Sequence, residues 1–351
     1  MILKQNKEIK GMNYIGSKFK LSDFIFESIK ERVSKPLNEY VFCDLFAGTG
    51  AVGRAFKGKV KKIIANDKEF YAFVLNKNYI ENHTKLENEG FLVRNLANLK
   101  GVKGKIYENY SFGGTKQKAH QRLYFSDENA LKIDAIRQEI ERLKKTNSIN
   151  LNAYYFLLAS LLEAADKVAN VACVYGAFLK KLKKTALQSL EFKGAEFECN
   201  DNSHEVYNQN ASKLIERICG DILYLDPPYN AREYGANYHL LNSIALYDDF
   251  VPQGKTGLRE YEKSAFCKKA SVAKAMENLI KKARFKWIFL SYNDEGILSL
   301  NEIAQIFSNY GKYELKSKSY QRFKADSKRA QKQDFTTEYL HILEKFDERV
   351  N

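Results

Sequence analysis

Strand-like and helix-like patterns of apolar residues alternate along most of this chain. Short runs rich in β-branched and aromatic residues occur at 41–45, 62–66, 222–225, 287–291, 313–319 and 337–343. The first two runs are each followed by a stretch with helical spacing, at 51–56 and 70–79. Strands that alternate with helices predict an α/β fold built on a wound parallel sheet.

The strand pattern stops between about Glu81 and Asn200. This stretch contains a glycine-bearing loop at 101–114 and a charged helix predicted at 129–145. The apolar spacing at 151–184 predicts a long buried helix or a pair of helices. Three charged residues interrupt that apolar run and argue against a membrane span: Glu163, Asp166 and Lys167. We therefore predict a largely helical region inserted into the sheet fold.

Composition changes this picture only slightly. Lys and Arg outnumber Asp and Glu by 57 to 43, a net charge of +14, which fits either a phosphate-rich partner or a generally basic protein. The five cysteines are scattered and form no CxxC pair, so neither a disulfide framework nor a metal site is expected. No segment resembles an export signal or a membrane span. We expect a protein of the reducing cytoplasm.

The stretch VFCDLFAGTGAVG at 41–53 predicts a strand, a tight turn and a helix start. Gly48, Gly50 and Gly53 satisfy G-x-G-x-x-G, and Asp67 ends the next strand, where an acid meets a ribose hydroxyl in nucleotide-binding folds. Two cofactors fit these residues, a nicotinamide dinucleotide and S-adenosylmethionine. The alternative is that the glycines only form the turn and Asp67 is an ordinary loop acid.

The stretch DILYLDPPYN at 221–230 ends a predicted strand with two of the four prolines in the chain. Asp226 and the carbonyl of Pro227 can accept the two hydrogens of an exocyclic amine and so favour its attack on an electrophile. Pro227 and Pro228 fix the backbone and remove competing donors. Tyr229 provides a ring on which a base taken out of a duplex can stack. The alternative is a proline-rich turn with Tyr229 in the core.

These motifs together resemble a known enzyme family. FAGTG at 46–50 and DPPY at 226–229, preceded by NYIGSK at 13–18, are similar to the adenine-specific DNA methyltransferases of the α-group motif order. Stretches at 160–181, 230–245 and 291–297 resemble a subgroup found in restriction–modification systems. The resemblance implies a Rossmann-like S-adenosylmethionine-dependent sheet, transfer of a methyl group to adenine N6 in a specific duplex DNA sequence, and a separately encoded restriction endonuclease as a possible partner.

The resemblance also assigns site residues. It implies that Tyr14 and Lys18 contact the cofactor, that Asp67 takes the ribose hydroxyls and that Asp226 lies between cofactor and target base. The methionine side of the cofactor would be lined by four residues: Asp44, Phe46, Gly48 and Gly50. Asn210 stands where the family has an aspartate near the cofactor's adenine, and its amide oxygen can still accept a hydrogen bond.

The resemblance divides the chain into three parts: catalytic residues 12–100, an inserted target-recognition region at 101–200, and catalytic residues 201–346. A basic run near the C-terminus, mixed with aromatic residues, is expected to contact DNA phosphates. The residues we assign to this contact are Lys316, Lys318, Arg322, Lys324, Lys328 and Arg329. The alternative for this run is a solvated basic face.

Four other functions remain open on the residues alone. An RNA amine can use the same acceptor pair, and a cytosine-N4 methyltransferase is possible, although a serine in place of Asp226 is more usual there. A dinucleotide-dependent oxidoreductase would rest only on the glycine turn and Asp67. A nucleic-acid-binding subunit with an inactive site is disfavoured by intact Asp226 and Tyr229.

Overall fold

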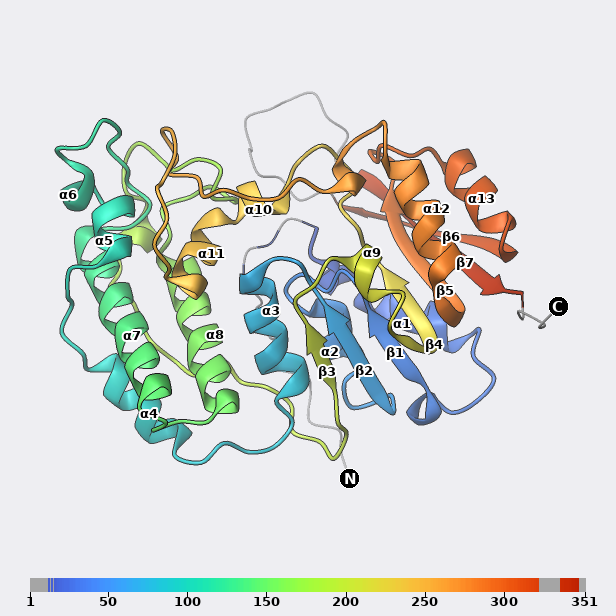
Figure 1. Cartoon of the computed structure of the whole chain (residues 1–351), viewed down its shortest axis with the longest axis horizontal. Coiled ribbons are helices and arrows are strands. Elements are labelled where there is room, and N and C mark those ends of the chain that lie inside the picture. The colour runs from blue at the N-terminus through green and yellow to red at the C-terminus, as the bar shows by residue number, and fades with distance from the viewer. Residues whose placement is uncertain (1–11, 13, 15, 322–334, 347–351) are drawn as a thin grey trace.

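The protein is described here by a computed structural model, which describes residues 12, 14, 16–321 and 335–346. Its centre is a seven-stranded sheet in the order β3-β2-β1-β4-β5-β7-β6 (Figure 1). The strands are β1 (Val41–Asp44), β2 (Lys62–Asn66), β3 (Glu205–Tyr207), β4 (Cys219–Leu225), β5 (Arg284–Asn293), β6 (Gly311–Gln321) and β7 (Phe335–Lys345). The first five are parallel along the sheet, and β7 is antiparallel to β5 and β6. The predicted Rossmann-like α/β sheet is confirmed.

The sheet order reverses between β1 and β4. Strand β2 lies on one side of β1 and β4 on the other, with Asp44 in register with Ala65 and Tyr224. The carboxyl ends of β1, β2 and β4 therefore meet at one edge of the sheet. Open α/β sheets bind ligands at this kind of reversal.

Side chains alternate between two buried cores, one on each face of the sheet. On β4, Ile222 and Tyr224 join the core that includes residues of α1 (Ser22–Lys30) and α2 (Ala51–Phe56). Leu223 and Leu225 join the opposite core, under α12 (Val272–Lys282) and α13 (Leu300–Ser308). This period of two places Asp226, just after β4, on the face of Tyr224.

The rest of the described chain is mainly helical, and most of it lies beside the sheet, whereas Ala211–Leu214 packs on the sheet face that α12 covers (Figure 1). Its helices are α3 (Phe70–Asn76), a π-helix (Lys77–Glu81), α4 (Glu89–Ala97), α5 (Lys105–Tyr110), α6 (Phe112–Thr115), α7 (Asp127–Lys145), α8 (Leu151–Val168), α9 (Ala211–Leu214), α10 (Tyr234–Asn237) and α11 (His239–Leu246). Short 3-10 turns are η1 (Lys18–Leu21), η2 (Leu37–Glu39), η4 (Lys184–Leu187) and η5 (Ala265–Cys267). The inserted region is largely helical, as predicted.

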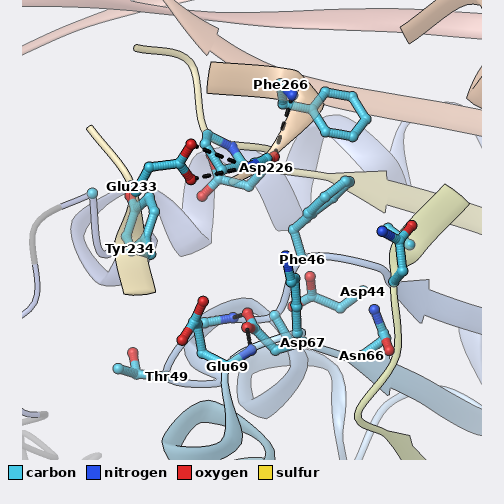
Figure 2. A pocket seen from close by; sticks show the side chains of 18 of the residues that line it. Asp44, Phe46, Thr49, Asn66, Asp67, Glu69, Asp226, Glu233, Tyr234 and Phe266 are labelled. Atoms are coloured by element: carbon cyan, nitrogen blue, oxygen red, sulfur yellow. Dashed lines mark hydrogen bonds between the residues drawn. The ribbon is translucent and has the colours of Figure 1, made fainter. Parts of the chain in front are cut away.

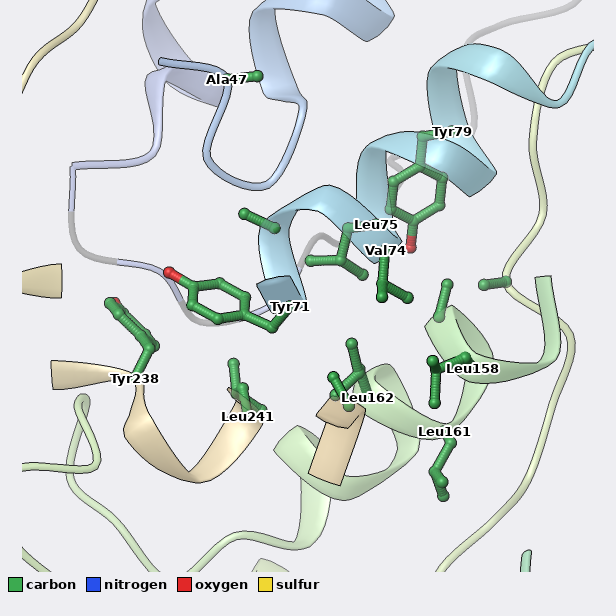
Figure 3. Packing of buried hydrophobic residues seen from close by; sticks show 14 of the residues in the cluster. Ala47, Tyr71, Val74, Leu75, Tyr79, Leu158, Leu161, Leu162, Tyr238 and Leu241 are labelled. Carbon is green, nitrogen blue, oxygen red and sulfur yellow. The ribbon is translucent and has the colours of Figure 1, made fainter. Parts of the chain in front are cut away.

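Helix α11 follows the DPPY segment in sequence but packs with the inserted helices. Figure 3 shows Val74 of α3 and Leu162 of α8 meeting near Leu241 of α11, all inside one buried cluster. Each of these side chains is fully buried, and burying a leucine or valine stabilises the fold by roughly 1.5–3 kcal/mol. The helical part is therefore fixed to the sheet through α3 and to the segment after DPPY through α11.

Two expectations about the inserted region were wrong in detail. The glycine-bearing stretch at 101–114 is not simply a loop, because it contains α5 and α6. The carboxylate of Asp134, on α7, accepts hydrogen bonds from the amides of Ile106 (3.0 Å) and Tyr107 (2.7 Å) and so caps the first turn of α5. The capping residue is distant in sequence, so local patterns did not reveal it.

The long apolar stretch at 151–184 is helical only as far as Val168. Asn170 follows, and its buried side chain donates to the carbonyls of Leu123 (2.9 Å) and Leu179 (3.0 Å). Its backbone amide donates to Tyr124 O at 2.7 Å. These bonds join three segments and replace the bonds that a continued helix would make.

Three further findings concern strand β3, membrane spans and metal sites. The short strand β3 was not predicted, because three residues carry too little pattern. Among the described residues, no helix is long and apolar enough to cross a bilayer. In the same part of the chain, no group of three or more His, Cys, Asp or Glu side chains is arranged to hold a metal ion.

Candidate active site

A pocket opens at the carboxyl ends of β1, β2 and β4, where the sheet order reverses (Figure 2). Nine of the residues predicted for the site line it: Tyr14, Lys18, Asp44, Phe46, Gly48, Asp67, Asn210, Asp226 and Pro228. The structure therefore brings together residues that lie up to about two hundred positions apart in the sequence. Gly50, Pro227 and Tyr229 do not line this pocket, but each is the sequence neighbour of a residue that does.

The glycine turn forms one wall and depends on backbone freedom. Gly48 has φ +52° and Gly50 has φ +79°, a region that side-chain-bearing residues rarely adopt. A Cβ atom on Gly50 would lie 2.8 Å from Oδ1 of Asn76, so this glycine is also required for close packing. Gly50 then caps the start of α2.

Asp67 joins the glycine turn to the end of β2. Its Oδ2 accepts a hydrogen bond from the Gly48 amide at 2.8 Å, and its Oδ1 accepts from the Glu69 amide at 2.8 Å. Burial raises the pKa of Asp67 to about 7, although these amide bonds oppose the rise. Asp67 therefore holds the turn in place and also lines the pocket, with acceptor capacity left on both oxygens.

Asp44 is the most deeply buried acid of the pocket, with a relative exposure of 1%. Within the described part of the chain, its Oδ1 has no hydrogen-bond partner. Burial, together with the charges of Asp226 and Asp67, raises the pKa of Asp44 well above its usual range. A buried oxygen of this kind is costly unless a donor or cation reaches it, so this oxygen suits a ligand that brings a hydrogen-bond donor or a positive charge.

Asp226 ends β4 and shares a buried cation with a second acid. Nζ of Lys18 lies 3.1 Å from Oδ1 of Asp226 and 3.0 Å from Oε1 of Glu338. Burial raises the pKa of Asp226 to about 6, Lys18 lowers it in part, and Glu338 opposes Lys18. Burial alone would lower the pKa of Lys18, but the two carboxylates raise it well above its usual range.

The residues after Asp226 leave the strand as a rigid turn. Pro227 is buried, Pro228 lines the pocket, and Tyr229 is half-buried beside it. The Tyr229 carbonyl accepts from the Ile297 amide at 2.8 Å, and its ring meets that of Tyr292 edge-on at 6.1 Å. The Lys18 ammonium lies 5.8 Å from the Tyr229 ring centre. Tyr229 thus has a fixed backbone and a ring supported on one side.

Aromatic rings form two other parts of the wall. The Tyr14 ring stacks on that of Tyr238 at 4.6 Å and lies 5.6 Å from that of Tyr234, which also lines the pocket. Phe46 meets Phe266 edge-on at 5.3 Å across the pocket mouth. Flat apolar walls of this kind suit an adenine ring or a methionine side chain.

The segment that carries Phe266 is held over the pocket by Glu233. The Ser264 amide donates to the two carboxylate oxygens of Glu233 at 3.0 and 3.1 Å (Figure 2). The Ser264 hydroxyl in turn accepts from the Phe266 amide at 3.2 Å. Neither Glu233 nor Phe266 was predicted from the sequence.

Asn210 lies at the pocket with its amide oxygen already engaged. Its Oδ1 accepts from the Ser212 amide at 3.0 Å and caps the short helix α9. We expect this oxygen to accept a hydrogen bond from an adenine amine as well, and that bond would have to use its second lone pair.

The structure describes only part of the basic run near the C-terminus that we expect to contact DNA phosphates. Lys316 pairs with Glu31, the residue that follows α1, and the Lys318 ammonium lies 5.6 Å from the centre of the Phe24 ring. The other residues assigned to DNA contact lie outside the described residues: Arg322, Lys324, Lys328 and Arg329. Lys316 and Lys318 lie on β6, at the edge of the sheet.

Sequence reasoning missed several residues of the site, among them Glu69, Glu233, Tyr234, Phe266 and Glu338. Glu69 could have been inferred from the sequence, since it follows Asp67 by two positions. In the structure its carboxylate accepts a hydrogen bond from the side-chain amide of Asn242 at 2.6 Å. Glu233 and Tyr234 follow DPPY closely, so their position near the site could be inferred from it. Phe266 and Glu338 had no local signal.

The strand order and the DPPY turn beside a pocket at the strand ends together define a Rossmann-like methyltransferase. Comparison with known protein families shows which kind of methyltransferase it is. The model of the D12 class N6 adenine-specific DNA methyltransferases matches residues 14–306, and the chain belongs to that family. The enzyme is therefore an adenine-specific DNA methyltransferase, and this family favours neither the oxidoreductase nor the RNA or cytosine-N4 alternative.

Named relatives agree with this assignment. Type II methyltransferase M.NlaIII of Neisseria lactamica is 56% identical over 336 residues, which cover 95% of this chain and 99% of that protein. Type II methyltransferase M.CviAII of Paramecium bursaria Chlorella virus 1 is 39% identical, with coverages of 90% and 93%. Type II methyltransferase M.FokI of Planomicrobium okeanokoites is 38% identical over 95% of this chain, which spans 53% of M.FokI.

Proposed function

We propose that this enzyme transfers the methyl group of S-adenosylmethionine to N6 of an adenine turned out of duplex DNA at a specific sequence. Family membership supports the reaction, and the position of Asp226 at the end of β4, beside the pocket, is the observation that carries the site assignment. The roles of the individual residues below belong to this proposal.

The charge of the pocket supports S-adenosylmethionine as the cofactor. Six carboxyl groups line it, on Asp44, Asp67, Glu69, Asp226, Glu233 and Glu262, against the ammonium groups of Lys18, Lys68 and Lys263. Lys18 faces Asp226 and Glu338, and Lys68 pairs with Glu262 at 2.7 Å. A pyrophosphate would be repelled here, whereas a cationic ligand would satisfy the unpaired oxygen of Asp44.

S-adenosylmethionine, when bound, supplies a methyl group carried on a sulfonium cation. Asp44 and Phe46 would then line the methionine side, Asp67 would accept from the ribose hydroxyls, and Asn210 would lie near adenine. Tyr14 would contribute an aromatic wall. Gly48 and Gly50 would allow the backbone to approach the cofactor closely.

Asp226 and the Pro227 carbonyl act on the target amine in this proposal. The lone pair of an adenine amine is delocalised into its ring, so two acceptors that hold its hydrogens make the nitrogen a better nucleophile. The carboxylate also stabilises positive charge as it develops on nitrogen. Pro227 and Pro228 keep the acceptors rigid, and Tyr229 stacks on the displaced base.

DNA contact is assigned to two regions. The basic residues of β6 and the run that follows, Lys316, Lys318, Arg322, Lys324, Lys328 and Arg329, would contact phosphates. The helical insertion, predicted at 101–200, would read the sequence, because phosphate contacts position a protein without specifying bases.

We also propose a biological setting. The relatives are Type II modification methylases, which supports a role as the modification enzyme of a restriction–modification system, with a separate endonuclease as partner. Because its substrate is DNA, we assign the enzyme to the cytoplasm.

A transfer assay tests the proposal. Purified protein is incubated with S-adenosylmethionine labelled in the methyl group, together with duplex DNA or total RNA. Label should enter DNA and not RNA, and one recognition sequence should account for it in a set of defined duplexes. Label in RNA alone would overturn the proposed substrate.

A further inference from the structure

Glu338 is a buried acid that lies outside all three of the family motifs named above, NYIGSK, FAGTG and DPPY. It lies on β7, has a relative exposure of 1%, and its Oε1 lies 3.0 Å from the ammonium of Lys18. In the part of the chain that the structure describes, its Oε2 has no hydrogen-bond partner. The residue also lies beyond the stretch at 14–306 that the family model matches.

The sheet brings Glu338 to the same face as the DPPY acid. Leu340 and Ile342 share the alternation of Glu338 along β7 and belong to the core that contains Tyr224. Glu338 stands opposite Asn293 of β5 in register, and β5 neighbours β4. Lys18 comes from the turn ahead of α1, which covers this face, and bridges the two acids.

Two carboxylates around one ammonium leave one negative charge in a buried place. Lys18 has a relative exposure of 5% and Asp226 one of 18%, so water screens this charge poorly. Asp226 alone would neutralise Lys18, and a second buried acid costs free energy. Stability of the fold therefore does not explain why two acids surround Lys18. An excess negative charge is useful, however, next to a substrate atom on which positive charge develops during a reaction.

We propose that Glu338 is a positioning residue for methyl transfer, which holds the Lys18 ammonium and offsets its charge so that Asp226 remains an effective anionic acceptor for the target amine. This inference rests on the proposed role of Asp226. During the reaction the amine nitrogen forms a bond to the methyl carbon, the electron pair of the broken C–S bond stays on sulfur, and the amine then loses one proton to solvent. Positive charge is largest on nitrogen before that loss, which is when the net negative charge acts.

Other charged and titratable groups surround Asp226, and a substitution at Glu338 does not alter their chemistry. Tyr224, Tyr229 and Tyr234 face it from β4 and the segment after β4, and Asp44 faces it from β1. Lys318 of β6 stands opposite Glu338 in register, but its ammonium lies over the Phe24 ring.

The test compares Glu338→Gln with a control on the same strand, Glu344→Gln. Glu344 is also a strand glutamate with a lysine partner, since its Oε1 lies 3.6 Å from Nζ of Lys286, but it is 36% exposed and far along β7 from the site. Single-turnover methylation of duplex DNA at saturating cofactor should fall roughly 10- to 100-fold in Glu338→Gln and less than about twofold in Glu344→Gln. Cofactor affinity should change less than about threefold in both.

The pH dependence separates a charge effect from mere loss of structure. Glu338 raises the pKa of Asp226, so its removal should move the acid limb of the single-turnover rate to lower pH. Glu338→Asp keeps the charge and should keep the wild-type midpoint. Glu338→Asp also tests the inference if Glu338→Gln fails to fold. A shift in the pH midpoint of its single-turnover rate would then contradict the inference.

A double-mutant cycle shows whether Glu338 acts through Lys18. In a Lys18→Met background, Glu338→Gln should cost at least about threefold less than in the wild type, because no ammonium remains to be held or offset. Equal losses in both backgrounds, or a normal rate and pH midpoint in Glu338→Gln, would overturn the inference. If the wild-type enzyme itself does not methylate adenine, the proposed function fails instead, so the two failures are distinguishable.

Discussion

The affinity of the pocket for S-adenosylmethionine should rise with pH between about 5.5 and 7. Asp67 lines the pocket, and burial raises its pKa to about 7. Burial raises the pKa of Asp44 well above its usual range and that of Asp226 to about 6. A ligand with sulfonium and ammonium groups binds best when these carboxyl groups are ionised, so its binding should release protons.

The ionisation of Asp67 alone shows how large the change in S-adenosylmethionine affinity between pH 5.5 and 7 should be. An acid with a pKa of about 7 is about 3% ionised at pH 5.5 and about 50% ionised at pH 7. If only the ionised form binds tightly, the affinity rises about 16-fold over this range, or about 1.6 kcal/mol. Asp44 and Asp226 act in the same direction. This pH range stays below about 7.7, where about half of an α-amino group has lost its charge.

Isothermal titration calorimetry measures both parts of this prediction. Affinity is determined at four pH values between 5.5 and 7, and proton release is obtained from two buffers with different ionisation enthalpies. Asp67→Asn should bind more weakly at pH 7 and lose the about 16-fold share of the pH dependence that Asp67 contributes, while the share of Asp44 and Asp226 remains. Glu262→Gln is the control, since pairing with Lys68 already lowers the pKa of this exposed pocket acid. An affinity that is flat within twofold, with no proton release, would refute the assignment of these acids to a cationic ligand.

Further outcomes follow from the same geometry. S-adenosylmethionine should raise the melting temperature while NAD does not, and the reverse result would contradict the cofactor assignment. Asp226→Ala should lower single-turnover methylation by on the order of 10³-fold while DNA binding persists; near-normal methylation would leave DPPY as a turn only. Tyr229→Ala should slow methylation by roughly 5- to 150-fold and Tyr229→Phe only slightly, since stacking requires the ring; equal losses would point to the hydroxyl. Replacing Lys316 and Lys318 together by alanine should weaken binding to every duplex and reduce the salt slope by up to about two, and an unchanged slope would indicate a solvated face.

Local sequence predicted those parts of the fold that depend on neighbouring residues. The alternation of strand and helix patterns indicated β1, β2, β4 and β5, because a buried parallel strand needs a short apolar run. The glycine turn and Asp67 were predictable as one unit, because a close backbone approach needs glycine at Gly48 and Gly50. DPPY was predictable because two prolines end a strand.

Contacts between distant segments were not predictable in this way. The cap that Asp134 gives to α5 comes from another helix, and Asn170 ends α8 by bonding to segments on either side of it. Glu338 lies more than a hundred residues from Asp226 and shares Lys18 with it only because β7 inserts between β5 and β6. Burial and partner charges at such places depend on the completed sheet, which no single stretch of sequence contains.

The central claim is that Asp226 and the Pro227 carbonyl accept the N6 amine of a displaced adenine. The most direct measurement is mass-spectrometric identification of the modified nucleoside after the enzyme has acted on duplex DNA with S-adenosylmethionine. The wild-type enzyme should yield N6-methyldeoxyadenosine as the modified nucleoside, and folded Asp226→Ala that still binds the cofactor should yield almost none. N4-methyldeoxycytidine in the wild-type digest, or N6-methyldeoxyadenosine at wild-type levels from Asp226→Ala, would contradict the claim.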